Sequence, residues 1–146
     1  MVNRPRRQRT ARLAKEMSRL PSDSAPISQP RTILFVDDDV IISMVTAMMI
    51  SDLGHTVLEA ASGPRALEIL RGGQPVDLLI TDYSMPKMSG AELAIAAREL
   101  RPDLPILLAT GYAELPKSVD IDLPRIGKPY VQGQLDAQIR KLLALG

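Results

Sequence analysis

The chain has 146 residues, enough for one domain with a complete hydrophobic core, and its lack of cysteine excludes a disulfide framework or a thiolate metal site. Its net charge of +1 conceals an asymmetry, because residues 1–31 hold eight basic and two acidic residues while the remaining 115 hold 10 basic and 15 acidic ones. The longest nearly apolar stretch, Val40 to Ile50, has 11 residues and the basic amino terminus precedes no apolar segment, so we expect neither a bilayer-spanning helix nor a secretory signal.

Residues 1–30 form a basic amino-terminal extension. Its second half contains several serines and three prolines, as is typical of a linker: Pro21, Pro26 and Pro30. The stretch from Thr10 to Leu20 has the pattern of a short basic helix with three apolar residues on one side: Leu13, Met17 and Leu20. Isolated helices of this length are marginal in water, so we predict a largely disordered extension. The alternative is that it binds nucleic acid, an anionic membrane or an acidic protein.

From residue 31 to residue 146, apolar runs of strand length alternate with helical segments. The predicted strands are Ile33–Val36, His55–Ala60, Val76–Thr81, Leu104–Ala109 and Arg125–Gly127. The predicted helices are Val40–Leu53, Pro64–Arg71, Gly90–Leu100 and Gln132–Leu145. Residues 111–124 contain two prolines and little apolar periodicity, so a helix between the last two strands is expected to be weak or missing. Apolar strands that alternate with helices predict an α/β domain with a parallel sheet covered on both faces.

Local signals mark where several helices begin and end. Asp39 and Ser62 stand where side-chain caps would begin the first two helices, and Gly54 stands where the first would end. Three methionines lie at helical spacing in the first helix: Met44, Met48 and Met49. We interpret them as core packing rather than as metal ligands, because the thioether side chain fills irregular gaps well. The last helix has four apolar residues on its expected buried side: Leu135, Ile139, Leu142 and Leu143.

Polar residues follow the apolar runs at the ends of several predicted strands. Asp37 and Asp38 follow the first strand and Asp82 follows the third, before a loop that contains Pro86 and Gly90. A doubly wound sheet binds ligands at the carboxyl ends of its strands. In the flavodoxin-like strand order 2-1-3-4-5 the first and third strands are neighbours, so the three carboxylates would lie together.

Three adjacent carboxylates repel one another, so they would either hold a proton or recruit a hard cation. Mg²⁺ fits, because it takes carboxylate ligands, keeps several waters and accepts phosphoryl oxygens. A carboxylate beside Mg²⁺ can attack phosphorus and form an acyl phosphate, which makes Asp82 the candidate nucleophile. Thr110 and Lys128 follow the last two strands and would supply a hydroxyl group and a cation to the transferring oxygens.

From Arg31 onward the chain resembles the receiver domain of two-component response regulators. The matching motifs are Val36-Asp37-Asp38, Thr81-Asp82 with Met85-Pro86 and Gly90, Ala109-Thr110, and Lys128-Pro129. The resemblance implies that Asp82 accepts a phosphoryl group from a phosphohistidine, and that Thr110 and Lys128 bind its oxygens. It implies that Mg²⁺ is held by Asp38 and Asp82, by Asp37 through water and by the backbone carbonyl of Ser84. It also implies a cis peptide bond between Lys128 and Pro129.

The chain departs from this family at the position that commonly acts as a conformational switch. Receivers commonly have an aromatic residue three positions before the lysine, where this chain has Arg125. Tyr112 instead lies two residues after Thr110, and Leu108-Ala-Thr-Gly-Tyr112 resembles a receiver subgroup that is named for its Phe-Ala-Thr-Gly-Tyr motif and has a weak or missing fourth helix. We expect Tyr112 to move as the threonine moves, and Arg125 to stay at the surface.

The resemblance implies two kinds of partner, a sensor histidine kinase and a downstream protein or phosphotransfer protein. We expect a single-domain cytoplasmic regulator, monomeric or weakly dimeric, that does not insert into membranes. It would be no enzyme beyond its own phosphorylation and dephosphorylation. We do not expect nucleic-acid binding, because the arginines lack aromatic partners and a recognisable DNA-binding fold. A receiver whose basic arm binds nucleic acid remains an alternative.

A second alternative is a phosphatase of the haloacid dehalogenase type. Asp37-Asp-Asp39-Val40 satisfies that family's Asp-x-Asp-x-Val pattern after a strand. Such an enzyme also needs an acidic pair after its lysine, and Asp136 falls in the last predicted helix. Hydrolysis of p-nitrophenyl phosphate separates the two classes, because a receiver should turn this substrate over negligibly.

Overall fold

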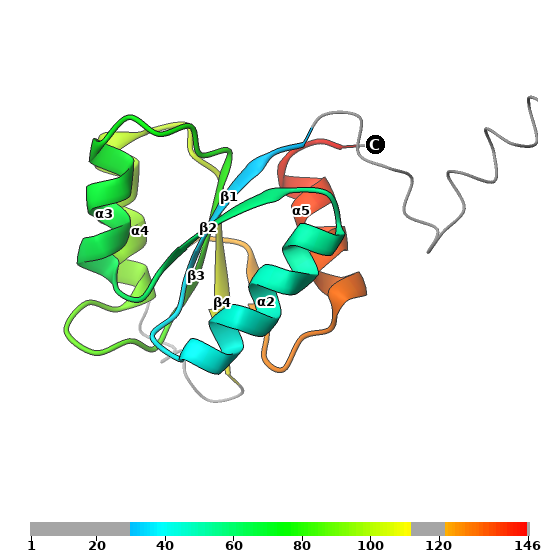
Figure 1. Cartoon of the computed structure of the whole chain (residues 1–146). Helices are drawn as coiled ribbons and strands as arrows, with labels where there is room; N and C mark the ends of the chain where they lie inside the picture. Colours follow the sequence, from blue (N-terminus) through cyan, green and yellow to red (C-terminus); the bar gives the residue numbers. More distant parts are fainter. Residues whose placement is uncertain (1–29, 112–121, 146) are drawn as a thin grey trace, which may run out of the picture.

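The computed structural model of the chain describes residues 30–111 and 122–145. Within them, five parallel strands form one sheet in the order β2-β1-β3-β4-β5, and four helices cover it (Figure 1). The strands are β1 (Thr32–Val36), β2 (Thr56–Ala60), β3 (Leu78–Asp82), β4 (Ile106–Thr110) and β5 (Arg125–Gly127). The helices are α2 (Val40–Asp52), α3 (Gly63–Arg71), α4 (Gly90–Leu100) and α5 (Gln132–Leu142). The predicted flavodoxin-like strand order is confirmed.

The helices form two layers on opposite faces of the sheet: α2 with α5, and α3 with α4 (Figure 1). Alternation along β1 divides the core between them, since Ile33 and Phe35 pack in the cluster that contains Ile50 of α2. Leu34 and Val36 pack in the cluster that contains residues of α3 and α4. Every residue of β3 and β4 is buried, which explains why these strands read as continuous apolar runs in the sequence.

The predicted helix signals are confirmed. The side chain of Asp39 accepts hydrogen bonds from the backbone N–H groups of Ile41 and Ile42, at 2.9 and 3.1 Å. Ser62 caps α3, and Gly54 follows α2 in the left-handed region, with φ at 99°. Leu135 and Ile139 of the last helix are buried, as expected, while Leu142 and Leu143 are partly buried against the same cluster.

The expectation that the methionines of α2 fill the core is wrong for two of them. Met44 and Met48 are 58% and 64% exposed, and only Met49 packs partly against the core. The face toward the sheet is instead occupied by four other residues: Ser43, Thr46, Ala47 and Ile50. An amphipathic period identifies a buried face only when polar residues mark the opposite side, and α2 is apolar on nearly all sides.

Two predictions concern residues that lie outside the described part of the chain. The weak or missing helix between β4 and β5 falls largely on residues 112–121, and the extension falls on residues 1–29 except for its last residue, Pro30. No helix within the described ranges combines the length and the apolar content needed to cross a membrane.

Candidate functional site

Strand pairing brings the predicted site residues to the carboxyl edge of the sheet. Val36 pairs with Thr81, so the residues that follow β1 lie beside the end of β3. Asp82 pairs with Ala109, and Thr110 pairs with Gly127 of β5. Each of these strands is held in register by buried apolar residues, so the polar groups that follow are carried to one place.

Three carboxylates meet at this edge. Asp37, Asp38 and Asp82 each offer an oxygen, and these oxygens all lie within 4.8 Å of one another. Asp37 and Asp82 are only 2% and 3% exposed, while Asp38 faces solvent. Buried like charges at this separation destabilise one another, so the cluster needs a compensating cation.

Lys128 supplies one positive charge to the cluster. Its Nζ lies 2.5 Å from Oδ1 of Asp82 and 3.5 Å from Oδ2 of Asp37. The Lys128 backbone N–H donates to the carbonyl oxygen of Thr110 at 2.8 Å, which fixes the turn after β5 against β4. The peptide bond from Lys128 to Pro129 is cis, as predicted. The ammonium group therefore sits where it can neutralise part of the charge of both buried carboxylates.

The cluster retains capacity for a further cation. Asp37 uses Oδ1 to accept the backbone N–H of Asp39 at 2.9 Å. Its Oδ2 is buried and accepts no hydrogen bond from any described residue. Three carboxylates without histidine or cysteine donors suit a hard divalent cation such as Mg²⁺. Ser84 is exposed in the loop after β3, and its carbonyl as a metal ligand stays a prediction.

The loop between Asp82 and α4 is held close to the site by Gly90. Its backbone N–H donates to the carbonyl oxygen of Tyr83 at 2.8 Å. A Cβ atom at Gly90 would lie 2.9 Å from Cα of Tyr83, and nearer still to the backbone of Asp82. The sequence predicts a turn here, while the structure adds that the backbone approaches too closely for any side chain.

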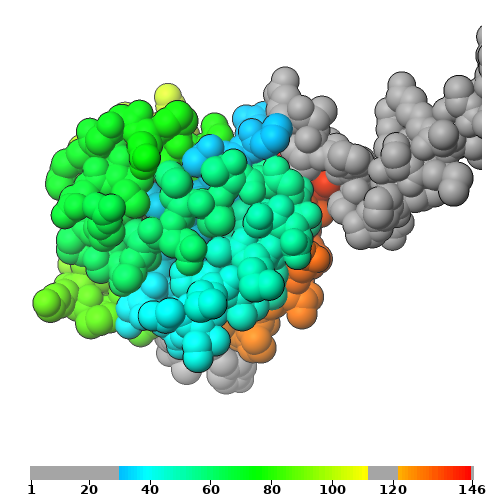
Figure 2. Space-filling model, in the orientation of Figure 1, coloured from blue at the N-terminus to red at the C-terminus, as the bar shows by residue number. Residues whose placement is uncertain are grey.

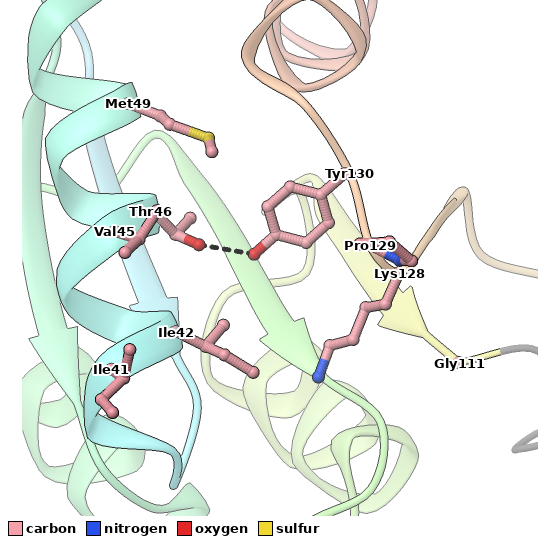
Figure 3. Close-up of a pocket in the computed structure, with 9 residues that line it drawn as sticks. All are labelled: Ile41, Ile42, Val45, Thr46, Met49, Gly111, Lys128, Pro129 and Tyr130. Atoms are coloured by element: carbon pink, nitrogen blue, oxygen red, sulfur yellow. Dashed lines mark hydrogen bonds between the residues drawn. The ribbon is translucent and has the colours of Figure 1, made fainter.

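A groove borders the site on the side of α2. It has a volume of about 460 Å³ and lies between α2 and the turn that joins β5 to α5 (Figure 3). Ile41, Ile42 and Val45 line one wall, and Lys128 and Tyr130 line the other. The groove thus continues the apolar surface of α2 up to the ammonium group of Lys128.

Tyr130 and Thr46 are site neighbours that sequence reasoning missed. Oγ1 of Thr46 lies 2.7 Å from the hydroxyl oxygen of Tyr130, in a hydrogen bond that ties α2 to the turn before α5 (Figure 3). Burial raises the pKa of the Tyr130 phenol, which keeps it protonated. The position of Tyr130 directly after Lys128-Pro129 was an available signal. Nothing in the sequence pointed to Thr46, because its role depends on the packing of α2.

Of the two residues predicted to take part in the switch, Arg125 and Tyr112, only Arg125 lies in the described part of the chain. Arg125 is exposed on β5, in agreement with the expectation that it stays at the surface. Tyr112 lies outside the described residues. Thr110 is 9% exposed at the end of β4, beside the strand that carries Asp82.

A parallel sheet with this strand order, an acidic cluster at its carboxyl edge and a lysine in contact with that cluster define a receiver domain. The family model described as the response regulator receiver domain matches residues 33–126. The chain belongs to this family, which confirms the resemblance seen in the sequence.

The chain is similar to proteins of different size within this family. It is 35% identical to the response regulator receiver protein CpdR of Brucella abortus, over 77% of this chain and 97% of CpdR. It is 34% identical to a part of the sensor kinase CckA of the same organism, covering 80% of this chain but only 13% of CckA. The crystal structure of a CheY-like receiver domain protein from Methanospirillum hungatei matches with a TM-score of 0.71 and 31% identity, over 80% of this chain and 95% of that one.

Proposed function

We propose that this receiver domain accepts a phosphoryl group on Asp82 from a phosphohistidine of a sensor histidine kinase, in a reaction that depends on Mg²⁺. The observation that carries the proposal is the position of Asp82. Its carboxylate is buried, lies beside those of Asp37 and Asp38, and contacts the ammonium group of Lys128. Similarity to part of a sensor kinase supports a kinase of that class as the donor.

The reaction is a transfer between two nucleophiles. An oxygen of Asp82 attacks phosphorus, the new O–P bond forms as the P–N bond to histidine breaks, and the imidazole, protonated at its other nitrogen, leaves as a neutral ring. Asp38, Asp82 and the backbone carbonyl of Ser84 would hold Mg²⁺ directly, and Asp37 would hold it through a water molecule. When bound, Mg²⁺ would neutralise charge on the carboxylates and the phosphoryl oxygens.

Two residues at the edge of the sheet would stabilise the transferred group. The ammonium group of Lys128 can exchange its contact with the Asp82 carboxylate for one with a phosphoryl oxygen. Thr110 stands on the neighbouring strand, and its hydroxyl would donate a hydrogen bond to another phosphoryl oxygen. The same two residues therefore report phosphorylation to β4 and β5.

Phosphorylation with a small donor tests the proposal. Acetyl phosphate with Mg²⁺ should add one phosphoryl group to the full chain, measured by intact mass, and EDTA should prevent the addition. Asp82→Asn should abolish the label. Asp77→Asn is the matched control, since Asp77 lies at the opposite end of β3 and should not affect labelling. Equal labelling of Asp82→Asn and the wild type would refute the assignment.

We further propose that residues 111–125 convert phosphorylation into an altered surface for a downstream protein. They join Thr110 to the strand before Lys128, so both ends would be drawn toward a bound phosphoryl group. Tyr112 would follow the threonine, and exposed Arg125 would contact an acidic partner. Hydrogen exchange with and without beryllofluoride tests this, because exchange in residues 111–125 should slow on binding. Strong protection in both states would contradict it.

A further inference from the structure

The outer surface of α2 is an apolar stripe. Five of the eight large hydrophobic residues that are exposed in the described parts of the chain lie on this helix. They are Val40 (68% exposed), Ile41 (73%), Met44 (58%), Val45 (47%) and Met48 (64%). They recur at helical spacing on the outer side of α2. Figure 2 shows the surface over this helix at the front of the molecule. The groove beside Lys128 borders the stripe through Ile41 and Val45. A helix that is apolar on all sides is normally covered.

The exposed charged residues at the two ends of α2 are acidic. The helix itself contains no basic residue, and exposed Asp52 ends it. At its other end lie exposed Asp38 and Asp39, next to the buried carboxylates of the site. The complement of this surface is therefore an apolar helix face flanked by basic side chains.

Residues 10–20 of the same chain have that composition. Leu13, Met17 and Leu20 are spaced for one helix face. The segment contains three basic residues, Arg12, Lys15 and Arg19, against one acidic residue, Glu16, and Arg9 directly precedes it. Residues 1–31 carry a net charge of +6 and the remainder of the chain −5, so the two parts attract each other.

The attachment point of the extension lies next to α2. The Arg31 backbone N–H donates to Nδ1 of His55 at 3.2 Å, and the His55 backbone N–H donates to the carbonyl oxygen of Ile50, near the end of α2. The nine residues 21–29 can span at most roughly 30 Å, whereas the 13 residues of α2 extend about 20 Å. Residues 10–20 can therefore reach the whole stripe. Covalent attachment gives them an effective concentration on the order of millimolar, so that a weak contact suffices.

We propose that residues 10–20 dock as a basic amphipathic helix on the exposed stripe of α2. The apolar face of the docked segment covers Met44, Met48 and their neighbours on α2. Its basic side chains lie toward the acidic residues at the two ends of α2. The docked segment covers the surface that leads to the groove beside Lys128. A protein partner that approaches the site along α2 must then displace it.

Disulfide trapping tests this contact, because the natural chain contains no cysteine. Met17→Cys is combined with Met44→Cys at the centre of the stripe, and the full chain is oxidised mildly at low salt and low protein concentration. An intramolecular disulfide should form, identified by mass after proteolysis. The matched control combines Met17→Cys with Ala137→Cys, which is exposed on α5 in the same helical layer. Its yield should be lower by about tenfold, because residues 10–20 are not held there.

A charge variant separates docking from random collision. Replacing Arg12, Lys15 and Arg19 by glutamate should lower the disulfide yield of the Met17→Cys and Met44→Cys variant several-fold. Added salt should lower the yield of the same cysteine variant when the three basic residues are kept. Equal yields for the two cysteine pairs, or no disulfide in either, would overturn the proposal. Disulfide-linked dimers of Met44→Cys alone would show that a second copy covers the stripe, which would also overturn it. Trapping should be unchanged in Asp82→Asn, so its outcome is independent of phosphorylation.

Discussion

The two edges of the sheet both hold ionisable groups, but these groups have different partners. At the amino edge, Asp77 accepts the backbone N–H of Thr32 at 2.8 Å, and His55 accepts that of Arg31, so both side chains tie β1 to its neighbours. At the carboxyl edge, Asp37 and Asp82 are held close together against a single lysine. The first arrangement stabilises the fold. The second opposes it, and such a cost is typical of a site shaped to bind a cation and a phosphoryl group.

The largest contrast should appear in the free energy of unfolding without metal. Asp77→Ala should lower it by about 2 kcal/mol, because a partly buried N–H group loses a charged acceptor. Asp82→Asn should leave it unchanged or raise it, because one repulsive charge disappears while the shape is kept. Urea unfolding in EDTA measures both. A large loss of stability in Asp82→Asn would show that the carboxyl edge is structural after all.

The affinity for Mg²⁺ should respond differently to the loss of two neighbouring carboxylates at the carboxyl edge. Asp38→Ala should weaken Mg²⁺ binding by about tenfold or more, because a direct ligand is lost. Asp39→Asn is the control, since asparagine caps a helix as well as aspartate does and Asp39 is not part of the cluster. Its affinity should stay within about twofold of the wild type. Isothermal titration with MgCl₂ measures both values, and similar losses in the two variants would contradict the assignment of ligands.

Removing the lysine should have a smaller effect of opposite sign. Lys128→Ala should leave Mg²⁺ affinity unchanged or tighten it about threefold, since a positive charge near the cluster is lost. It should also remove the response of residues 111–125 to beryllofluoride. Lys87→Ala in the exposed loop after β3 is the control. A clear fall in affinity for Lys128→Ala would mean that the lysine organises the metal site rather than competing with the metal.

The smallest effect should be the pH dependence from the amino edge. Burial lowers the pKa of His55 below its usual 6.5, with Asp136 and Asp77 acting against this and Arg140 and Arg31 adding to it. The unfolded chain then takes up a proton first as the pH falls, so the free energy of unfolding should decrease below about pH 6.5 and level off once the folded protein is also protonated. Chemical unfolding at several pH values measures this decrease. His55→Gln should reduce it, and an unchanged pH profile would rule out His55 as its source.

Much of the fold was readable from the sequence. Strong apolar runs identified β1, β3 and β4, because strands buried on both faces leave no polar interruption. Predicted element boundaries agree with the structure to within three residues, and the capping residues Asp39 and Ser62 were found because their chemistry is local. The residues of the acidic cluster were also predicted, since each follows a strand directly and parallel strands end at one edge.

The tertiary structure decided what depends on orientation and close approach. The sequence of α2 has no polar side to mark its exposed face, so only packing shows that Met44 and Met48 point outward while Ser43 and Thr46 point inward. Its inward face explains the bond from Thr46 to Tyr130. The requirement for glycine at position 90 is likewise a property of backbone contacts that residue types do not encode. Sequence by itself thus determined which groups reach the sheet edge, because that follows from local pattern and topology. Only packing determined how they face one another and which apolar surface stays open beside them.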